Sequence, residues 1–342
     1  MKKVNNYTEI TEAVDRHFGK TTVTNCFLSR ETYDREIACG TLYLEETDGG
    51  VYIFRRRDGF DVMYFYLDST DISPARITTG GDIVCEIPYR ERDEKMIAVA
   101  ERFTECGYDK LFSRVRLAKM AEEDYYTDEH ITAADGRDHD SVAALLESSY
   151  DRRTGCLPND ESLRDDIDAG RVLVYRDGGI AGLLHYTDDK NMSEIRHVAV
   201  DETRRGEGIA SHLVRAYLAS RTGRCRVWAR EDYHSARRIY EKNGYTADGM
   251  KSDVLIFRKG TGENNMKEKQ KLIAILEDIV PGVDFEAENE LIDDGILESL
   301  DIVSIVNEIM EQFDVEISVD DLLPENFNSA DAILALIKSK QD

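Results

Sequence analysis

The stretch Thr203-Arg204-Arg205-Gly206-Glu207-Gly208-Ile209-Ala210 decides how the middle of this chain folds. The residues before it, 193–200, alternate between apolar and polar side chains, which is the pattern of a half-buried strand. After it, Ile209, Leu213 and Tyr217 recur at helical spacing. The glycines therefore lie on a turn from a strand to a helix, where backbone N–H groups can bind an anion. With two arginines at the same end, the stretch predicts a phosphate-binding loop.

The motif Arg205-x-x-Gly208-x-Ala210 resembles the acyl-CoA pyrophosphate loop of the GCN5-related N-acetyltransferase (GNAT) superfamily. Its neighbours strengthen the resemblance, because a strand precedes the loop and 239–245 (IYEKNGY) resembles the family's tyrosine helix and Gly-aromatic turn. A structural turn without a ligand is the alternative interpretation of the two glycines. The resemblance implies a GNAT domain over 125–260, of α/β (α+β) class, with a mixed central sheet and flanking helices.

The resemblance also implies roles for particular residues. Tyr240 would protonate the leaving thiolate, and Glu194 is the candidate base for the acceptor amine. The backbone of Val198 and Val200 would pair with the pantetheine amides like an added strand, and one of these N–H groups would steady the oxyanion. The donor's phosphates would be bound by the loop residues Arg205, Gly206, Glu207, Gly208, Ile209, Ala210 and Ser211.

Each of these assignments has a structural alternative. Tyr240 can be a packed helix aromatic, and Glu194 can be a strand carboxylate paired with an arginine. By strand alternation His197 points to the face opposite Glu194, and His234 is another candidate base. Glu207 departs from the family pattern, in which a cation is common at this position.

Residues 1–124 repeat the order of elements found in the second domain. Strands are expected over 41–46, 51–56, 61–67, 83–87 and 110–119, with a helix over 94–106. The segment 103–108 (FTECGY) echoes 240–245 (YEKNGY), which indicates an internal duplication. We expect the first copy to be degenerate, because Gly80-Gly81 stands without the R-x-x-G-x-G pattern and Phe103 replaces the tyrosine. This half would support the second domain or form a wall of its acceptor site, and pure packing is the alternative.

Residues 267–342 form an acidic module after a polar linker, 261–266. The segment from 266 onward holds 20 acidic residues against 5 lysines, a net charge of −15 out of −25 for the whole chain. Apolar residues at helical spacing predict an all-α four-helix bundle. The segment 293–301 (DDGILESLD) resembles an acyl carrier protein, in which Ser299 matches the serine that receives 4′-phosphopantetheine. The alternative is that Ser299 only caps a helix.

Composition excludes several classes. The 342 residues suggest two or three domains, and 41% hydrophobic content is enough to fill cores. No apolar run approaches the ~20 residues that span a bilayer, and no secretory signal opens the chain. Six scattered cysteines without metal-like spacing predict structural thiols in a cytoplasmic protein with no metal. The net charge of −25 argues against a nucleic-acid partner.

Together these features predict an N-acyltransferase that moves an acyl or aminoacyl group from a pantetheine thioester, carried on its own Ser299, to an amine. The implied cofactors are covalent 4′-phosphopantetheine and acyl-CoA or acetyl-CoA. The implied partners are a phosphopantetheinyl transferase, an acyl- or amino-acid-activating ligase and a small-molecule amine, with no nucleic acid and no membrane. Two alternatives stay open: an acyl-CoA-dependent N-acetyltransferase whose carrier serves a separate pathway, and a non-catalytic carrier-docking scaffold.

Overall fold

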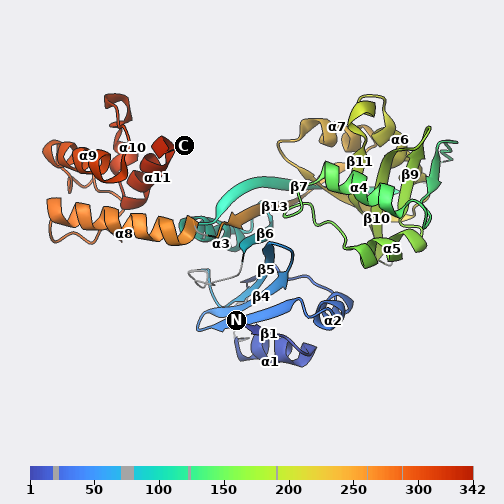
Figure 1. The fold of residues 1–342 in the computed structure, drawn as a ribbon, viewed down its shortest axis with the longest axis horizontal. Coiled ribbons are helices and arrows are strands. Elements are labelled where there is room, and N and C mark those ends of the chain that lie inside the picture. Colours follow the sequence, from blue (N-terminus) through green and yellow to red (C-terminus); the bar gives the residue numbers. More distant parts are fainter. Residues whose placement is uncertain are drawn as a thin grey trace. The chain divides into compact units, whose positions relative to one another are not determined.

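The computed structural model describes residues 1–17, 23–70, 81–121, 125–189, 192–259, 261–286 and 288–341. The chain divides into two compact units, Met1–Phe257 and Arg258–Asp342 (Figure 1). Two features discussed above, the boundary after residue 124 and Gly80, lie outside the described residues.

The first half of the larger unit follows the predicted order of elements, with ends shifted by at most a few residues. Its elements are β1 (Lys2–Lys3), α1 (Tyr7–His17), β2 (Val23–Thr24), α2 (Arg30–Ala38), β3 (Leu42–Thr47), β4 (Gly50–Arg56), β5 (Phe60–Leu67), β6 (Asp82–Arg90), α3 (Glu94–Glu105) and β7 (Asp109–Ala121).

The second half contains the predicted glycine loop, which lies between η1 and α6. Its elements are β8 (Ile131–Ala133), α4 (His139–Ser149), α5 (Asp160–Asp168), β9 (Val172–Arg176), β10 (Ile180–Asp189), β11 (Met192–Val200), the 3-10 turn η1 (Glu202–Arg204), α6 (Ile209–Ala219), β12 (Gly223–Arg230), α7 (His234–Lys242) and β13 (Thr246–Phe257).

Among the described residues, thirteen strands form one mixed sheet in the order β1-β3-β4-β5-β6-β13-β7-β12-β11-β10-β9-β8, with β2 on β5. The two halves exchange their last strands. β6 pairs with β13 and β12 pairs with β7, and the two exchanged strands also pair with each other, all antiparallel. Because neither half completes its own sheet, residues 1–257 fold as one unit rather than as two separable domains.

The last strand of this unit begins earlier than the sequence indicates. The apolar run predicts a strand from Val254, whereas β13 starts at Thr246. Its register shifts between Ala247 and Lys251, and Gly249 lies in this shift with a φ of 80°. A bulge of this kind interrupts the alternation of side chains, so the polar first part of the strand has no strand-like pattern.

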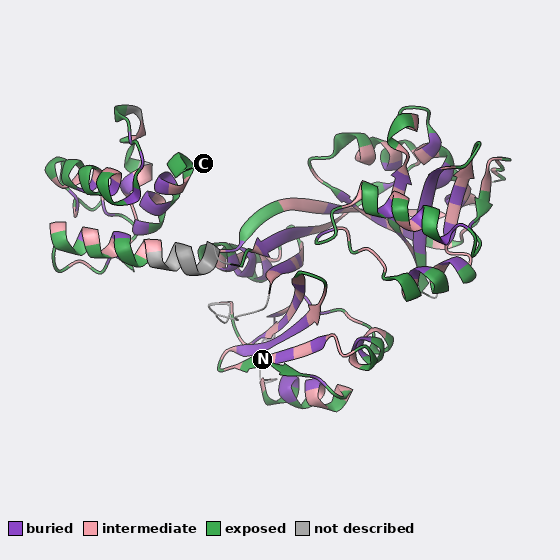
Figure 2. Ribbon diagram, viewed as in Figure 1, coloured by how far each residue is buried: buried purple, intermediate pink, exposed green. Residues whose placement is uncertain are grey.

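Helices cover both faces of the second half, and each face buries its own core (Figure 2). Leu183 and Leu184 are neighbours on β10, and successive strand residues point to opposite faces. Leu183 packs into the core beneath α4 and α5, and Leu184 into the core beneath α6 and α7. The glycine loop is therefore anchored by a helix that is itself packed onto the sheet.

The smaller unit is helical, with elements α8 (Thr261–Ile279), α9 (Ser299–Phe313), the 3-10 turn η2 (Val319–Asp321), α10 (Pro324–Phe327) and α11 (Ala330–Gln341). They enclose a common apolar core that includes Leu276, Ile305 and Ile333. Residues 261–266, expected to be a polar linker, are the first residues of α8 instead. None of the helices described in either unit is long and apolar enough to cross a membrane.

Candidate active site

β11 and β12 are paired over only part of their length and separate beyond it. They pair in parallel from Met192 with Arg224 to Ile195 with Val227, and no ladder pair follows. On its other edge β11 stays paired with β10 as far as Val200. The last part of β11 therefore has one backbone edge that no strand covers, and a ligand with amide groups can pair with such an edge.

Val198 presents its backbone to this uncovered edge, and the Tyr150 hydroxyl engages both of its polar groups. The hydroxyl accepts a hydrogen bond from Val198 N–H and donates one to Val198 C=O, each with a 2.9 Å separation. Tyr150 is the residue that ends α4, so it reaches β11 from the helical layer. Burial raises the pKa of its hydroxyl to about 12, which keeps the donated proton in place near neutral pH.

The glycine loop has the geometry of an anion site. Gly206 and Gly208 have φ values of 91° and 86°, a region that only glycine occupies readily. The backbone N–H groups of residues 206–210 have no acceptor among the described residues. Arg204 holds the Glu207 carboxylate at 2.9 Å and Asp177 at 2.8 Å, so the acidic residue in the loop is neutralised from within.

Close packing positions this loop against the sheet. A Cβ atom at Gly182 of β10 would lie 2.7 Å from Ile209 Cγ2, so glycine lets the start of α6 sit directly on the strand. At the other side, Asn243 Nδ2 donates to Ser211 Oγ at 3.3 Å and to Ile239 C=O at 2.8 Å. The predicted phosphate loop and the predicted tyrosine helix are thereby joined through Asn243.

Tyr240 lies on α7, packed within the core between that helix and the sheet. Its side chain is buried, and its ring meets the Tyr245 ring edge-on with centroids 5.8 Å apart. Burial, reinforced by the nearby Tyr150 hydroxyl, raises the pKa of Tyr240 well above its ordinary value. The phenol is therefore protonated and has a proton to donate.

Glu194 lies on β11 with both carboxylate oxygens engaged. Arg196 Nη1 contacts one oxygen at 2.9 Å, and Arg226 Nη2 contacts the other at 3.0 Å. The structure thus places the candidate base within an ion-paired cluster. His234, the other candidate, is the exposed first residue of α7.

A buried polar chain, which the sequence patterns did not indicate, runs behind β11. Its central pair is His185 and His197, with Nδ1 atoms 3.0 Å apart. His185 Nε2 lies 2.8 Å from the Asp166 carboxylate, and His197 Nε2 lies 2.8 Å from Gly155 C=O. Although burial opposes ionisation, the hydrogen bond from His185 and the nearby Arg171 lower the pKa of Asp166. No group of three or more metal-ligating side chains is suitably placed in the described part of the chain.

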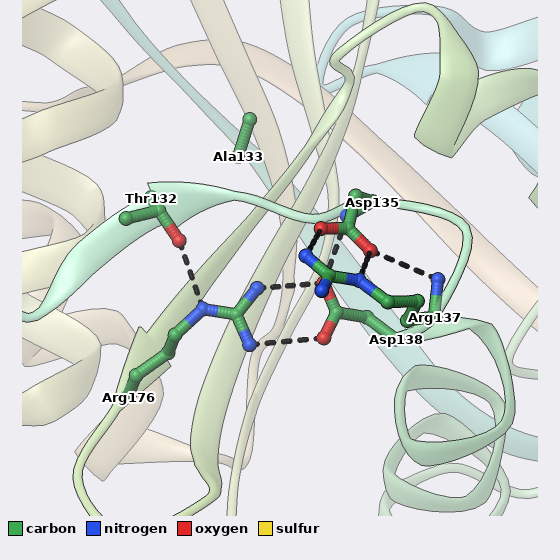
Figure 3. Close-up of a pocket in the computed structure, with 6 residues that line it drawn as sticks. All are labelled: Thr132, Ala133, Asp135, Arg137, Asp138 and Arg176. Carbon is green, nitrogen blue, oxygen red and sulfur yellow. Dashed lines mark hydrogen bonds and ion pairs between the residues drawn. The ribbon is translucent and has the colours of Figure 1, made fainter.

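Two surface hollows lie away from these residues. One of about 650 Å³ is lined by Thr132, Ala133, Asp135, Arg137, Asp138 and Arg176 (Figure 3). Its guanidinium groups are already paired, since Arg176 binds Asp138 at 2.6 Å and Arg137 binds Asp135 at 2.7 Å. A second hollow is lined by residues around Arg224 and Asp248, which also pair with each other. Because their charged groups are satisfied, neither hollow competes with the β11 edge as a candidate site.

In the smaller unit, Ser299 is the first residue of α9 and Glu298 is the N-cap. The cap is closed by Asp301, whose carboxylate accepts the Glu298 N–H at 2.9 Å. Ser299 is exposed, and its hydroxyl bonds no other described residue. The simple capping role for Ser299 is therefore excluded, since that position belongs to Glu298.

Arginines cluster in the sequence between α6 and α7, and a group of this kind would be a docking patch for an acidic partner if its charges were free. Most of them are paired with a carboxylate of the same unit: Arg221 with Asp188, Arg224 with Asp248, Arg226 with Glu194, Arg230 with Asp232 and Arg237 with Glu241. The positive charge available to a partner is correspondingly smaller than the sequence suggests.

Part of the chain is similar to known proteins. Residues 168–247 match the family model of the acetyltransferase (GNAT) domain. A GCN5-related N-acetyltransferase from Sphaerobacter thermophilus is 15% identical, covering 68% of this chain and 87% of its own, with a TM-score of 0.47. A GNAT-family acetyltransferase from Colwellia psychrerythraea is 10% identical, covering 75% and 98%, with a TM-score of 0.46. No curated protein matches the chain.

The matched segment contains the end of β11, the glycine loop and Tyr240. The protein is therefore an enzyme of the N-acetyltransferase class. Residues 168–247 match a GNAT acetyltransferase domain, which confirms the family resemblance for that segment.

Proposed function

We propose that this enzyme transfers an acyl or aminoacyl group from a pantetheine thioester, carried on its own Ser299, to an amine. The observation that carries the proposal is an exposed, unbonded serine hydroxyl at the start of α9, in the same chain as an acetyltransferase domain. The dipole of a helix N-terminus tolerates the charge of a phosphodiester at this position. The partners would be a phosphopantetheinyl transferase, an acyl- or amino-acid-activating ligase and the small-molecule amine.

The donor site of this proposal fits a phosphopantetheine group. N–H groups of residues 206–210 would bind the phosphate, since they are clustered and have no other acceptor among the described residues. The uncovered edge at Val198 and Val200 would pair with the donor's pantetheine arm, with Val198 N–H directed at the thioester oxygen and the other polar groups of this edge at the pantetheine amides. When bound, the thioester supplies the activated acyl carbon, while the chain's own groups orient it and handle protons.

Tyr240 is the proposed general acid, because burial raises the pKa of its hydroxyl and keeps it protonated, and because the hydroxyl interacts electrostatically with Tyr150, which contacts Val198. Glu194 remains the proposed base. Both of its oxygens are held by guanidinium groups, so it would accept a proton only after Arg196 or Arg226 gives way to the acceptor's ammonium group. Direct release of the proton to water is the competing route.

The first half would be a degenerate GNAT copy that forms one wall of the acceptor site. Its β6 and β7 reach the segment after α4, where Arg114 Nη1 contacts Glu86 Oε1 and Arg114 Nη2 donates to Thr154 C=O, both at 2.5 Å. Cys156 Sγ lies 3.7 Å from the same Glu86 oxygen. These polar groups from both halves support an acceptor that carries charge.

The second candidate is an acyl-CoA-dependent transferase whose carrier serves another pathway. The loop N–H groups, which have no acceptor among the described residues, support this candidate as much as the first. The test compares the wild-type chain, phosphopantetheinylated and loaded with an acyl group, with Ser299→Ala, which cannot be loaded. Transfer to the amine is measured in each chain without and with free acyl-CoA. Loss of carrier-dependent transfer alone supports the first candidate. Full turnover with acyl-CoA and none from the loaded wild-type carrier supports the second.

Ser304→Ala is the matched control, since Ser304 is an exposed serine of the same helix whose hydroxyl only donates to Leu300 C=O. Tyr240→Phe addresses a non-catalytic scaffold, which would not depend on that hydroxyl. Mass spectrometry of the Ser299 peptide identifies the carried group, and an unmodified serine in cells with an active transferase would contradict the carrier role.

A further inference from the structure

The Tyr150 hydroxyl occupies the backbone position that the proposed mechanism reserves for the donor. Val198 N–H is the group proposed to meet the thioester oxygen, and here it donates to Tyr150 instead. The same hydroxyl also donates its hydrogen to Val198 C=O. An amide N–H makes one good hydrogen bond at a time, so the donor carbonyl and this hydroxyl compete for it.

The contact between Tyr150 and Val198 is fixed by the surrounding structure, because both the backbone and the ring of Tyr150 are held by other residues. The Tyr150 N–H donates to Leu146 C=O at 3.1 Å, which holds its backbone at the end of α4. Its ring packs edge-on against His197, with centroids 4.9 Å apart. The segment that follows is held from two sides, by His197 at Gly155 C=O and by Arg114 at Thr154 C=O.

We infer that Tyr150 is a placeholder for the donor's thioester carbonyl, which must displace its hydroxyl from Val198 for the acyl group to bind. The inference rests on the proposed function, because it assumes that Val198 N–H receives that carbonyl. It makes Tyr150 a determinant of donor affinity that acts before the chemical step. Here the hydroxyl satisfies a strand edge that has no partner strand.

The alternative is that Tyr150 assists the chemical step instead of competing with the donor. If Tyr150 stayed beside Val198 and donated its hydrogen to the thioester oxygen, it would stabilise the transition state. A hydroxyl has only one hydrogen, however, and here it is committed to Val198 C=O. The two roles predict opposite effects of removing the hydroxyl.

The test is Tyr150→Phe in the full chain, with binding of acetyl-CoA and of S-ethyl-CoA measured by titration calorimetry, and kcat and KM measured with acetyl-CoA. S-ethyl-CoA keeps the nucleotide, the pantetheine and the sulfur but lacks the carbonyl. For a placeholder, the variant binds acetyl-CoA about two- to tenfold more tightly, the range expected for one net hydrogen bond. S-ethyl-CoA affinity and kcat stay within twofold of wild type.

Tyr186→Phe is the matched control. Like Tyr150, its hydroxyl donates to a carbonyl at 2.9 Å, that of Gly170, and accepts one N–H, from Arg221, and its ring packs against another aromatic ring, that of Tyr217. Its donor affinities should not change. A fall in kcat for Tyr150→Phe, or equal changes for both ligands, overturns the placeholder role and leaves the proposed function intact. Failure of wild type to bind either ligand removes acyl-CoA as donor and the placeholder with it.

Discussion

His185 and His197 face each other across β10 and β11 with their Nδ1 atoms 3.0 Å apart. That contact needs one hydrogen between the two nitrogens. The Nε2 contacts to the Asp166 carboxylate and to Gly155 C=O need one hydrogen each, because both oxygens are acceptors. Two neutral imidazoles carry only two hydrogens, so three satisfied contacts require a third.

We predict that three of the four ring nitrogens in this pair are protonated at neutral pH. The pKa of the Asp166 carboxyl is lowered, so this carboxylate is an acceptor and the hydrogen in its contact lies on the histidine nitrogen. Nitrogen NMR of histidine-labelled protein distinguishes protonated ring nitrogens from those with a lone pair. Two protonated nitrogens in the pair would show that one of the contacts is not a hydrogen bond.

The stability of the larger unit should fall in acid because of His197. Burial, and secondly His185, lower the pKa of His197 to about 3, whereas an exposed histidine titrates near ~6.5. Between these values the unfolded chain binds a proton that the folded chain does not. The contribution of His197 to the free energy of unfolding therefore has its full value above about pH 6.5 and decreases as the pH falls.

Thermal unfolding between pH 7 and 4 measures this dependence, with a slope of up to about 1.4 kcal/mol per pH unit from this one group. His197→Asn should flatten the slope, even where it lowers stability throughout. His234→Asn, which changes an exposed histidine, should leave the slope as in wild type. An unchanged slope in His197→Asn would mean that other groups cause the acid sensitivity.

Tyr240→Phe should reduce kcat about 10²-fold and leave the donor KM unchanged, as expected when a general acid is removed. Tyr245→Phe is the control, because its ring touches Tyr240 and its buried hydroxyl has no hydrogen-bond partner among the described residues. That control should retain full activity. Equal activity of both variants would show that water, and not Tyr240, protonates the leaving thiolate.

The parts of this site that sequence patterns predict are those set by local geometry. The positive φ angles of Gly206 and Gly208, the place of Tyr240 on its helix and the place of Ser299 at the start of α9 each follow from a short segment. Such segments carry their own turn and capping chemistry, so a motif is enough to place them.

The remaining parts depend on pairings between distant segments. β13 lies between β6 and β7 because the two halves exchange strands, and no property of 246–257 alone indicates which strand it joins. The His185–His197 pair depends on the register of a hairpin that contains an irregularity next to His185. Tyr150 has no motif around it, and only its distance to Val198 reveals its role.

Gly182→Ala should destabilise the larger unit and weaken donor binding together. The new methyl group would lie 2.7 Å from Ile209 Cγ2 and 3.1 Å from Ala199 C=O, so the start of α6 must move. Overpacking of this kind costs about 1–3 kcal/mol, and the displaced loop should raise the donor KM. Gly179→Ala, which meets nothing within 4 Å, should change neither the unfolding midpoint nor KM. Unaltered stability of Gly182→Ala would show that α6 can shift without cost.

Glu207→Gln should tighten binding of donors that carry phosphate. Glu207 places a negative charge in the loop whose N–H groups would bind the phosphate, and it also occupies Arg204. Removing that charge should lower the KM for acetyl-CoA about two- to fivefold, the range for one charge at a helix N-terminus. The KM for S-acetylcysteamine, a thioester without phosphate, should stay the same. Because Arg204 also pairs with Asp177, Asp177→Asn is the matched control, and it should have the smaller effect since that carboxylate lies outside the loop. An equal change in KM for both donors would show that Glu207 acts on the shape of the loop rather than on the charge of the ligand.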